Sequence, residues 1–442
     1  MKKNSPPKLL LFFFAFTVGC SCNESTDQQS SRRHEFNPGF KLVSSKKFLF
    51  NNFVDCNMAE AWIADTFRIF PGKYGEDTVW GNARDLKFAS GKNPDETFLT
   101  PSSLFTEPKL PFNERVGQQG LHGAVWFETI YQDANDASGK TLFAIYHNEN
   151  YPENLPYNGA SGKGYKKENW PEGLRGPLTS AAVCRIGIMK STDGGWTWSN
   201  KGIFLEDLQS RLILKPHNVS KTFAGGVGDP SAVVSGEHLY LFYGEYGYPG
   251  LYNEKVYDPD KEWRGQCISV ARIGLKDLDN PEGKARRWNG KEFDASYDST
   301  GVPVASLQIP KKDGGGPASS PAAEFYWGPS VSWNEYLNCW VMLMAKSTGS
   351  SWTGSSIYIS FNKNKDLGEG MNSQEWTAPQ LVLNKPGRTL WYPSLQPMNT
   401  AEDISKKRTC LRLGQKARLF IKSNWDGGSE YSSEYIIEFN KQ

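Results

Sequence analysis

Three stretches of the chain repeat one short pattern, a proline and a serine followed by aliphatic residues. They are Gly228–Val233, Trp327–Val331 and Trp391–Leu395, and each leads into a second apolar run. Proline is tolerated where a strand begins, and the next apolar run can return as the second strand of a hairpin. A strand pair that recurs along a chain is typical of radially repeated sheets. The repeats therefore predict an all-β fold of the β-propeller type.

Two further groups of strand-like segments precede these repeats, which gives five candidate blades. The first group runs from about Ala61 to Phe105, and the second begins at Leu121. Short apolar runs alternate with Gly, Pro and Asp turns, and no convincing long helical period interrupts them. We therefore expect a five-bladed β-propeller, forming a single domain over residues 41–442.

The N-terminus predicts export. Three lysines precede the apolar run Leu9–Phe16, which is far shorter than the roughly 20 residues that a membrane-spanning helix needs. The Gly19-Cys20 junction resembles a bacterial lipobox, which implies a lipoprotein signal peptide at residues 1–19 and a lipid on Cys20; an ordinary secretory signal is the alternative. The polar residues that follow predict a flexible tether at residues 20–40. We expect a cell-envelope lipoprotein, anchored to the outer membrane or the cell surface.

The composition argues against several kinds of partner. Basic and acidic residues number 50 and 48, and removal of the signal takes away three lysines, so the net charge stays near zero. A nucleic-acid-binding domain is usually strongly basic, so we expect no nucleic-acid partner and no membrane contact beyond the lipid anchor. The cysteines are dispersed and lack zinc-site spacing, and we expect neither a bound metal nor a cofactor. A monomer is expected.

The segment Ser191–Trp198 matches the Asp-box turn found in sialidases and other propellers. Asp193 can accept hydrogen bonds from the turn backbone, glycine supplies a positive φ, and Trp198 can pack beneath the hairpin. We interpret this motif as a fold marker, and Asp193 as structural rather than catalytic.

The Asp229-Pro230-Ser231 entry and the strand Leu239–Tyr243 resemble the five-bladed propeller glycosidases, the arabinanases and β-xylosidases of glycoside hydrolase family 43 and their relatives. Further segments resemble a group of exported bacterial propeller proteins: Tyr146–Glu149, Gly225–Asp229, Trp327–Asn334 and Trp391–Pro393. The resemblance covers most of the chain from about Trp126 onward. It implies a propeller fold and activity on a polysaccharide or oligosaccharide.

Hydrolysis of a glycosidic bond uses two carboxyl groups that flank the bond. Asp229 is the first candidate, as general base or electrostatic partner, because it is the acidic variant of a repeated position. Glu149 is the candidate acid, since it ends an apolar strand beside His147. Asp65 is the third, although the Asp-Pro pair that the resemblance implies is missing there. The alternatives are a capped turn for Asp229, a solvated strand end for Glu149 and a partner of Arg68 for Asp65.

Polar and aromatic residues at strand entries and strand ends are the candidate substrate-binding groups, because aromatic faces contact sugar rings and basic groups bind acidic substituents. They are His122, His147, Arg68, Glu245, Glu324, Trp327, Lys346, Trp391 and Tyr392. By resemblance only, a central calcium ion could be held through water and His122.

Two other functions stay open. A noncatalytic surface lipoprotein that binds glycans would use the same aromatic residues but would need no carboxyl pair. A sialidase-like exo-glycosidase is suggested by Phe67-Arg68-Ile69-Phe70-Pro71, in which Phe70 is an extra residue relative to the sialidase element. We favour the glycosidase because of the acids.

Overall fold

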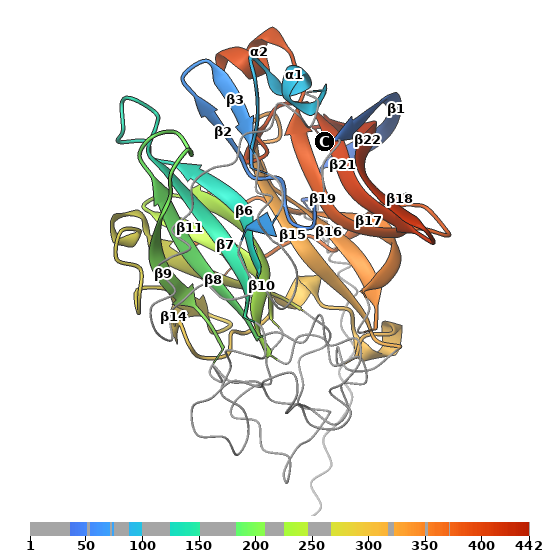
Figure 1. Cartoon of the computed structure of the whole chain (residues 1–442). Coiled ribbons are helices and arrows are strands. Elements are labelled where there is room, and N and C mark those ends of the chain that lie inside the picture. The colour runs from blue at the N-terminus through green and yellow to red at the C-terminus, as the bar shows by residue number, and fades with distance from the viewer. Residues whose placement is uncertain are drawn as a thin grey trace, which may run out of the picture. The chain divides into compact units, whose positions relative to one another are not determined.

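The structure, a computed structural model, describes residues 36–50, 54–70, 73–74, 88–99, 124–150, 183–207, 225–245, 267–316, 322–349, 352–370 and 372–441. From Asn37 onward they belong to one compact unit. Strands dominate this unit (Figure 1). Within the ranges above, the α-helices are α1 (Pro94–Leu99) and α2 (Ala401–Ser405), and no helix there is long and apolar enough to cross a membrane.

The first two blades are built from short antiparallel strands. Blade 1 consists of β2 (Glu60–Ile63), β3 (Thr66–Ile69) and β5 (Ala89–Gly91). Blade 2 consists of β6 (Ala124–Gln132), β7 (Leu142–Asn150), β8 (Val183–Ser191) and β9 (Ser199–Leu205), and β4 (Lys73–Tyr74) pairs with its first strand.

Blades 3 and 4 follow the same meander. Blade 3 contains β10 (Gly225–Ser235), β11 (His238–Glu245), β12 (Ile268–Gly274), β13 (Arg286–Trp288) and β14 (Phe293–Ser296). Blade 4 contains β15 (Glu324–Asn334), β16 (Cys339–Thr348), β17 (Thr353–Asn362) and β18 (Gln380–Asn384), and β20 (Arg412–Leu413) pairs in parallel with β15. Three short 3₁₀ turns also lie in this part of the described chain, at Leu275–Asp277, Ala305–Leu307 and Lys311–Asp313.

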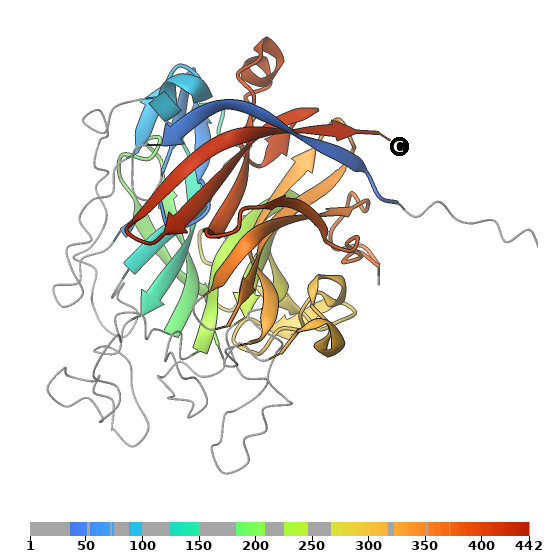
Figure 2. The ribbon, with the colours of Figure 1, turned by 90° about the vertical axis from the view of Figure 1, so that its right-hand side faces the viewer.

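Blade 5 joins the two ends of the domain. Its strands β19 (Thr389–Pro397), β21 (Lys416–Trp425) and β22 (Gly428–Asn440) are completed by β1 (Gly39–Phe50), which pairs with β22 from Gly39 opposite Asn440 to Phe50 opposite Tyr431. Figure 2 shows β1 in blue beside the red C-terminal strand. Because the N-terminal strand closes the last blade, unrolling the ring would break this pairing.

The first strands of successive blades contact one another, β2 with β6, β6 with β10, β10 with β15 and β15 with β19. The ring closes where the indole Nε1 of Trp62 donates to the carbonyl of Arg408 (3.0 Å) and the amide of Cys410 donates to Glu60 (2.7 Å). Five antiparallel blades around a common axis make a β-propeller, as the repeats predict. The domain begins with β1 at Gly39, slightly before the predicted boundary at residue 41. The signal peptide, Cys20 and most of the tether lie outside the described residues.

The repeated Pro-Ser pattern forms a β-bulge in the first strand of three blades. Pairing shifts register between Gly228 and Ser231, between Trp327 and Ser330, and between Trp391 and Ser394. The residue before each proline has a positive φ: 48° at Asp229, 58° at Gly328 and 46° at Tyr392. A bulge changes the direction in which a side chain points. β6 carries a comparable shift between Phe127 and Thr129, so Glu128 is a bulged residue too.

Hydrogen bonds and ring packing among its own and adjacent residues stabilise the Asp-box turn between β8 and β9. One carboxylate oxygen of Asp193 accepts from the amides of Trp196 and Thr197, both at 3.0 Å. The buried indole of Trp198 packs against Phe127, with ring centroids 4.9 Å apart. These contacts fit the interpretation of the motif as a structural turn.

Candidate active site

Three ionisable side chains from neighbouring strands converge inside the ring of first strands. Glu128 on β6, His147 on β7 and Asp229 on β10 each offer one oxygen or nitrogen atom, and these atoms all lie within 4.8 Å of one another. The residues are 1%, 2% and 3% exposed. Burial of charge is costly unless it is compensated, and clusters of buried ionisable groups are typical of catalytic and binding sites.

Asn57, just before β2, forms hydrogen bonds to the bulged strands around this cluster. Its backbone amide donates to Oε2 of Glu128 (2.7 Å), and its side-chain Nδ2 donates to the carbonyls of Pro230 (3.3 Å) and Pro329 (3.2 Å). One residue of blade 1 thus fixes the bulges of blades 2, 3 and 4. The other carboxylate oxygen of Glu128, Oε1, lies 3.7 Å from Nδ1 of His147.

Asp229 is held from two sides. The hydroxyl of Tyr392 donates to its Oδ1 (3.0 Å), and the same oxygen lies 3.5 Å from Nδ1 of His147. The backbone amide of Asp229 donates to that nitrogen (3.5 Å). The hydroxyl and the carboxylate come from corresponding bulge positions in blades 5 and 3, so two copies of the repeat meet in this hydrogen bond.

Burial and mutual contact perturb the acid–base properties of the cluster. Burial raises the pKa of Glu128 to about 7, and His147 opposes this rise while Asp229 adds to it. The pKa of His147 lies well above its usual value: burial lowers it, but Cys184, Asp229 and Glu128 together raise it more. Burial also raises the pKa of the Cys184 thiol to about 11. The shifts at Glu128 and His147 both favour the protonated form of the group concerned.

Asp55 lies beside the cluster and is more accessible than its members, with its side chain 28% exposed. It forms an ion pair with Lys422 of β21. Burial raises the pKa of Asp55, Lys422 lowers it, Asp229 raises it and His147 lowers it, and the net shift is upward. These influences show that Asp55 and the cluster of Glu128, His147 and Asp229 form one electrostatic unit.

Aromatic rings line the side of the site formed by blades 4 and 5. Trp327 contacts Trp391 and Tyr392 edge to face, with ring centroids 5.9 and 5.4 Å apart. The ammonium group of Lys422 lies 5.1 Å from the ring centroid of Trp391, and Nε1 of Trp391 donates to the carbonyl of Trp352 (2.8 Å). Carboxyl groups beside tryptophan rings are an arrangement suited to binding sugars.

Several residues singled out from the sequence lie at or next to this site. His147, Asp229 and Tyr392 contact one another, and Trp327 and Trp391 form the aromatic side. Glu149 is two residues beyond His147 on β7, hence on the same face of that strand, and is partly exposed. Its charge acts on Cys184, the neighbour of His147. Lys346 pairs with Glu324 (2.8 Å) where β15 begins and β16 ends.

Other residues singled out from the sequence lie away from this site. Asp65 is fully exposed on the turn between β2 and β3, 4.0 Å from Lys407. Arg68 donates to the carbonyl of Gly194 in the Asp-box turn, and its guanidinium lies over the ring of Phe88. Glu245 forms a fully buried ion pair with Arg287 (3.0 Å). In each of these three residues the charged side chain takes part in a local structural contact. His122 lies outside the described residues.

Sequence reasoning missed Glu128, Asp55 and Asn57. Glu128 stands in the apolar strand Ala124–Gln132, and an acid within such a strand is a signal that could have drawn attention. Asp55 and Asn57 precede a short strand and carry no motif. Only the closure of the ring brings them beside the bulges of other blades.

The three clustered residues could each donate one ligand atom to a metal ion. Calcium prefers six to eight oxygen ligands, so two carboxylates and an imidazole would form only part of a calcium shell.

No protein-family model matches the chain, and the curated proteins searched contain no match. Solved structures are similar in fold. An arabinanase from Bacillus subtilis matches at 10% identity over 88% of this chain and 95% of that chain, with a TM-score of 0.42. An endo-1,5-α-L-arabinanase from Thermotoga petrophila matches at 12% identity over 88% and 72%, with a TM-score of 0.40. An exo-β-1,3-galactanase from Phanerochaete chrysosporium matches at 10% identity over 89% and 64%, with a TM-score of 0.40. The chain is structurally similar, at low sequence identity, to the five-bladed propeller glycoside hydrolases of family 43.

Proposed function

We propose that the protein is an exported, lipid-anchored glycoside hydrolase that acts on a polysaccharide or oligosaccharide. The observation that carries this proposal is the cluster of Glu128, His147 and Asp229, with atoms within 4.8 Å of one another, and with Asp55 near enough for the charges of Asp229 and His147 to influence its pKa. Acidic groups with perturbed pKa values beside aromatic rings are what glycoside hydrolysis requires. Export and lipidation of Cys20 are supported by the N-terminal pattern.

The accessible carboxyl groups are the proposed reacting pair. Asp55, which is partly exposed, would act on water or on the sugar, and Glu149, at the end of β7, would donate a proton to the leaving oxygen. Glu128 and Asp229 are almost fully buried, so they would not touch the substrate. With His147 they would act as positioning residues that set the charge around the reacting pair. Lys422 would keep Asp55 oriented.

The test is release of reducing sugar from a panel of plant, algal and host polysaccharides by the protein without residues 1–19. We expect Asp55→Asn and Glu149→Gln each to lower kcat by at least about a hundredfold, the usual contribution of general acid–base catalysis. Asp65→Asn is the matched control, since that carboxylate is fully exposed on a turn of the same blade as Asp55. Equal activity of all three variants would refute the assignment of the reacting pair.

A noncatalytic glycan-binding lipoprotein is the second candidate. The ion pair between Asp55 and Lys422 and the burial of Glu128 and Asp229 favour it, because paired or buried carboxylates suit a structural role. Retention on one polysaccharide without any sugar release, surviving Asp55→Asn and Glu149→Gln, would establish this function in place of hydrolysis.

A further inference from the structure

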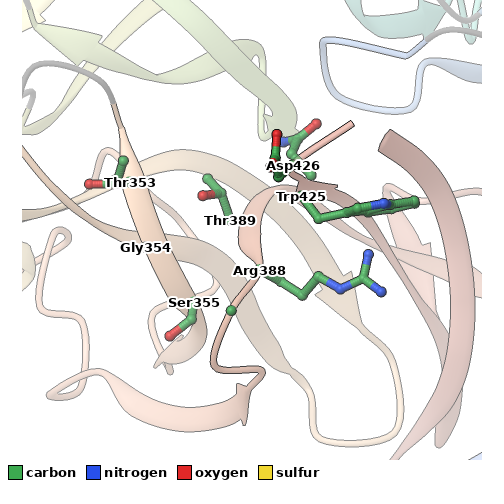
Figure 3. Close-up of a pocket in the computed structure, with 9 residues that line it drawn as sticks. Thr353, Gly354, Ser355, Arg388, Thr389, Trp425 and Asp426 are labelled. Atoms are coloured by element: carbon green, nitrogen blue, oxygen red, sulfur yellow. The ribbon is translucent and has the colours of Figure 1, made fainter. Parts of the chain in front are cut away.

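An open groove lies where β17 and β19 begin and β21 ends, with a cavity volume of about 580 Å³. Figure 3 shows its polar and aromatic lining. Thr353 and Ser355 come from blade 4, whereas Arg388, Thr389, Asn424 and Trp425 come from blade 5. The groove thus follows the seam between two neighbouring blades.

The groove lies two residues along β19 and β21 from residues of the candidate active site. Trp391 of β19 lies opposite Lys422 of β21, and two residues further along Thr389 lies opposite Asn424. Side chains two residues apart on a strand share a face, so the groove and the Lys422–Asp55 ion pair lie on one face of the blade 5 sheet. The indole of Trp391 also donates to the carbonyl of Trp352, which immediately precedes Thr353. A linear molecule bound at the site could extend into the groove.

The most distinctive group in the groove is a stacked arginine. The guanidinium carbon of Arg388 lies 4.0 Å from the ring centroid of Trp425, which itself packs against the backbone of Gly428. Stacking restricts the guanidinium while leaving its N–H groups free to donate in the ring plane. Among the described residues no carboxylate is paired with Arg388, and Figure 3 shows Asp426 on another side of the groove.

The remaining lining supplies hydroxyl groups, from Thr353, Ser355 and Thr389. The hydroxyls of Thr353 and Ser355 already donate to the carbonyl of Thr348 (3.0 Å) and to Oδ1 of Asn384 (2.7 Å), so their oxygens can accept a hydrogen bond from a sugar hydroxyl. The stacked guanidinium is the group that suits a ligand with anionic oxygens, because arginine binds carboxylate and sulfate groups through two N–H groups.

We propose that this groove is an accessory subsite for an acidic sugar unit of the bound glycan, one that carries a carboxylate or a sulfate ester. This inference rests on the proposed function, because it assumes that the central site holds a sugar chain. Arg388 contacts the anionic group, and the hydroxyl groups contact hydroxyls of the sugar ring. The protein would therefore prefer glycans in which acidic units accompany the unit held at the central site.

The experiment is isothermal titration calorimetry of the full chain in detergent with three probes: an oligogalacturonate, a sulfated galactan oligosaccharide and a neutral arabino-oligosaccharide. We expect one acidic probe to bind more tightly than the neutral one, and Arg388→Gln to weaken that binding about tenfold or more, the size of a lost charge-assisted contact. Trp425→Ala should weaken it as well, because the guanidinium loses its support. Whichever acidic probe responds identifies carboxylate or sulfate as the recognised group.

The control is Arg286→Gln, an exposed arginine on β13 that binds only the carbonyls of Gly283 and Ala285 in the described structure. It should leave all affinities unchanged. The inference fails if no acidic probe binds, if the neutral probe binds equally well, or if Arg388→Gln has no effect. Binding is measured without hydrolysis, so Arg388-dependent binding without sugar release would overturn the proposed hydrolase and leave the subsite standing. Sugar release that Arg388→Gln does not change would support the proposed hydrolase and overturn the accessory subsite.

Discussion

In the candidate site two acids lie beside one histidine. Glu128 and Asp229 lie 3.7 and 3.5 Å from Nδ1 of His147, so negative charge on either acid favours the protonated imidazole. Burial favours the protonated form of Glu128, and His147 favours its ionised form. The charge state of the cluster thus depends on both groups together, and a substitution at one of them should alter the other.

Tyr392→Phe is predicted to remove a hydrogen bond to Asp229 and to lower the stability of the fold. The variant removes the hydroxyl that donates to Oδ1 and leaves the rest of the buried ring in place. We expect a loss of about 1–3 kcal/mol in the free energy of unfolding, because a buried carboxylate loses one hydrogen-bond donor. Urea denaturation monitored by tryptophan fluorescence measures it. Tyr336→Phe, at a partly exposed tyrosine outside the site, should change stability little, and equal losses in the two variants would contradict the prediction.

Glu60 should make stability depend on pH. Burial raises its pKa from 4.5 to about 8 in the folded protein. Between these values the folded state keeps a proton that the unfolded state has released, so stability is fully present below pH 4.5 and falls as the pH rises to 8. The slope approaches about 1.4 kcal/mol per pH unit for one such group.

Glu60→Gln removes this titration, because an amide stays neutral. The variant should therefore gain stability relative to the wild type as the pH rises from 5 to 8, in thermal unfolding followed by circular dichroism. Glu292→Gln, at an exposed glutamate, serves as the control. Parallel curves for the wild type and Glu60→Gln would show that Glu60 does not titrate in this range.

At the scale of single elements, a bulged first strand recurs in several blades of this fold. The same Pro-Ser pattern sets a positive φ at Asp229, Gly328 and Tyr392, and the side chain at that position decides what the blade contributes. Blade 3 contributes a carboxylate and blade 5 a hydroxyl, whereas blade 4 contributes no side chain. Non-glycine residues at positive φ are strained, and strain of this kind is concentrated at functional sites.

Gly328→Ala tests this strain directly. A methyl group at Gly328 would meet no described atom within 4 Å, so steric clash is not expected, and the cost comes from the φ of 58°. We predict a loss of about 1–2 kcal/mol in the free energy of unfolding by urea. Gly39→Ala is the matched control, because a methyl group there makes ordinary contacts at 3.7 Å and no positive φ is needed. Equal effects at the two positions would argue against strain at the bulge.

At the scale of the whole molecule, ring closure by β1 determines whether the site exists. β1 pairs with β22 along nearly its whole length, and blade 1 begins shortly after it. Asp55 and Asn57 lie in that connection, between the closing strand and β2. The segment that closes the ring therefore also carries two residues of the candidate site.

Deletion of residues 1–50 should abolish cooperative folding. β22 would lose its partner and become an exposed edge strand, which promotes association. We expect loss of the sigmoidal thermal transition in circular dichroism and aggregation in size-exclusion chromatography. Deletion of residues 1–35 is the control and should preserve the transition, because β1 is kept intact. A soluble protein with a wild-type transition after the longer deletion would refute the role of β1.

The sequence by itself determined those features, such as strand entries and turns, that depend on residues adjacent in the chain. Pro-Ser after a turn residue specifies a strand entry, so the repeats predicted the propeller and drew attention to Asp229 and Tyr392. The Asp-box could also be recognised from the sequence, because Asp193 accepts hydrogen bonds within its own turn. Apolar alternation did not reveal that Glu128 faces His147, since a bulge interrupts the strand period at that residue.

Only the tertiary structure decided which charges meet. Asp65 and Arg68 resemble site residues in sequence, yet a turn exposes the first and the Asp-box turn engages the second. Asp55 carries no motif, yet closure of the ring places it beside Lys422, more than 360 positions away along the chain. The physical reason is that electrostatic interactions act over a few ångströms in space. Separation along the chain does not set those distances, because the five blades bring their first strands to one axis.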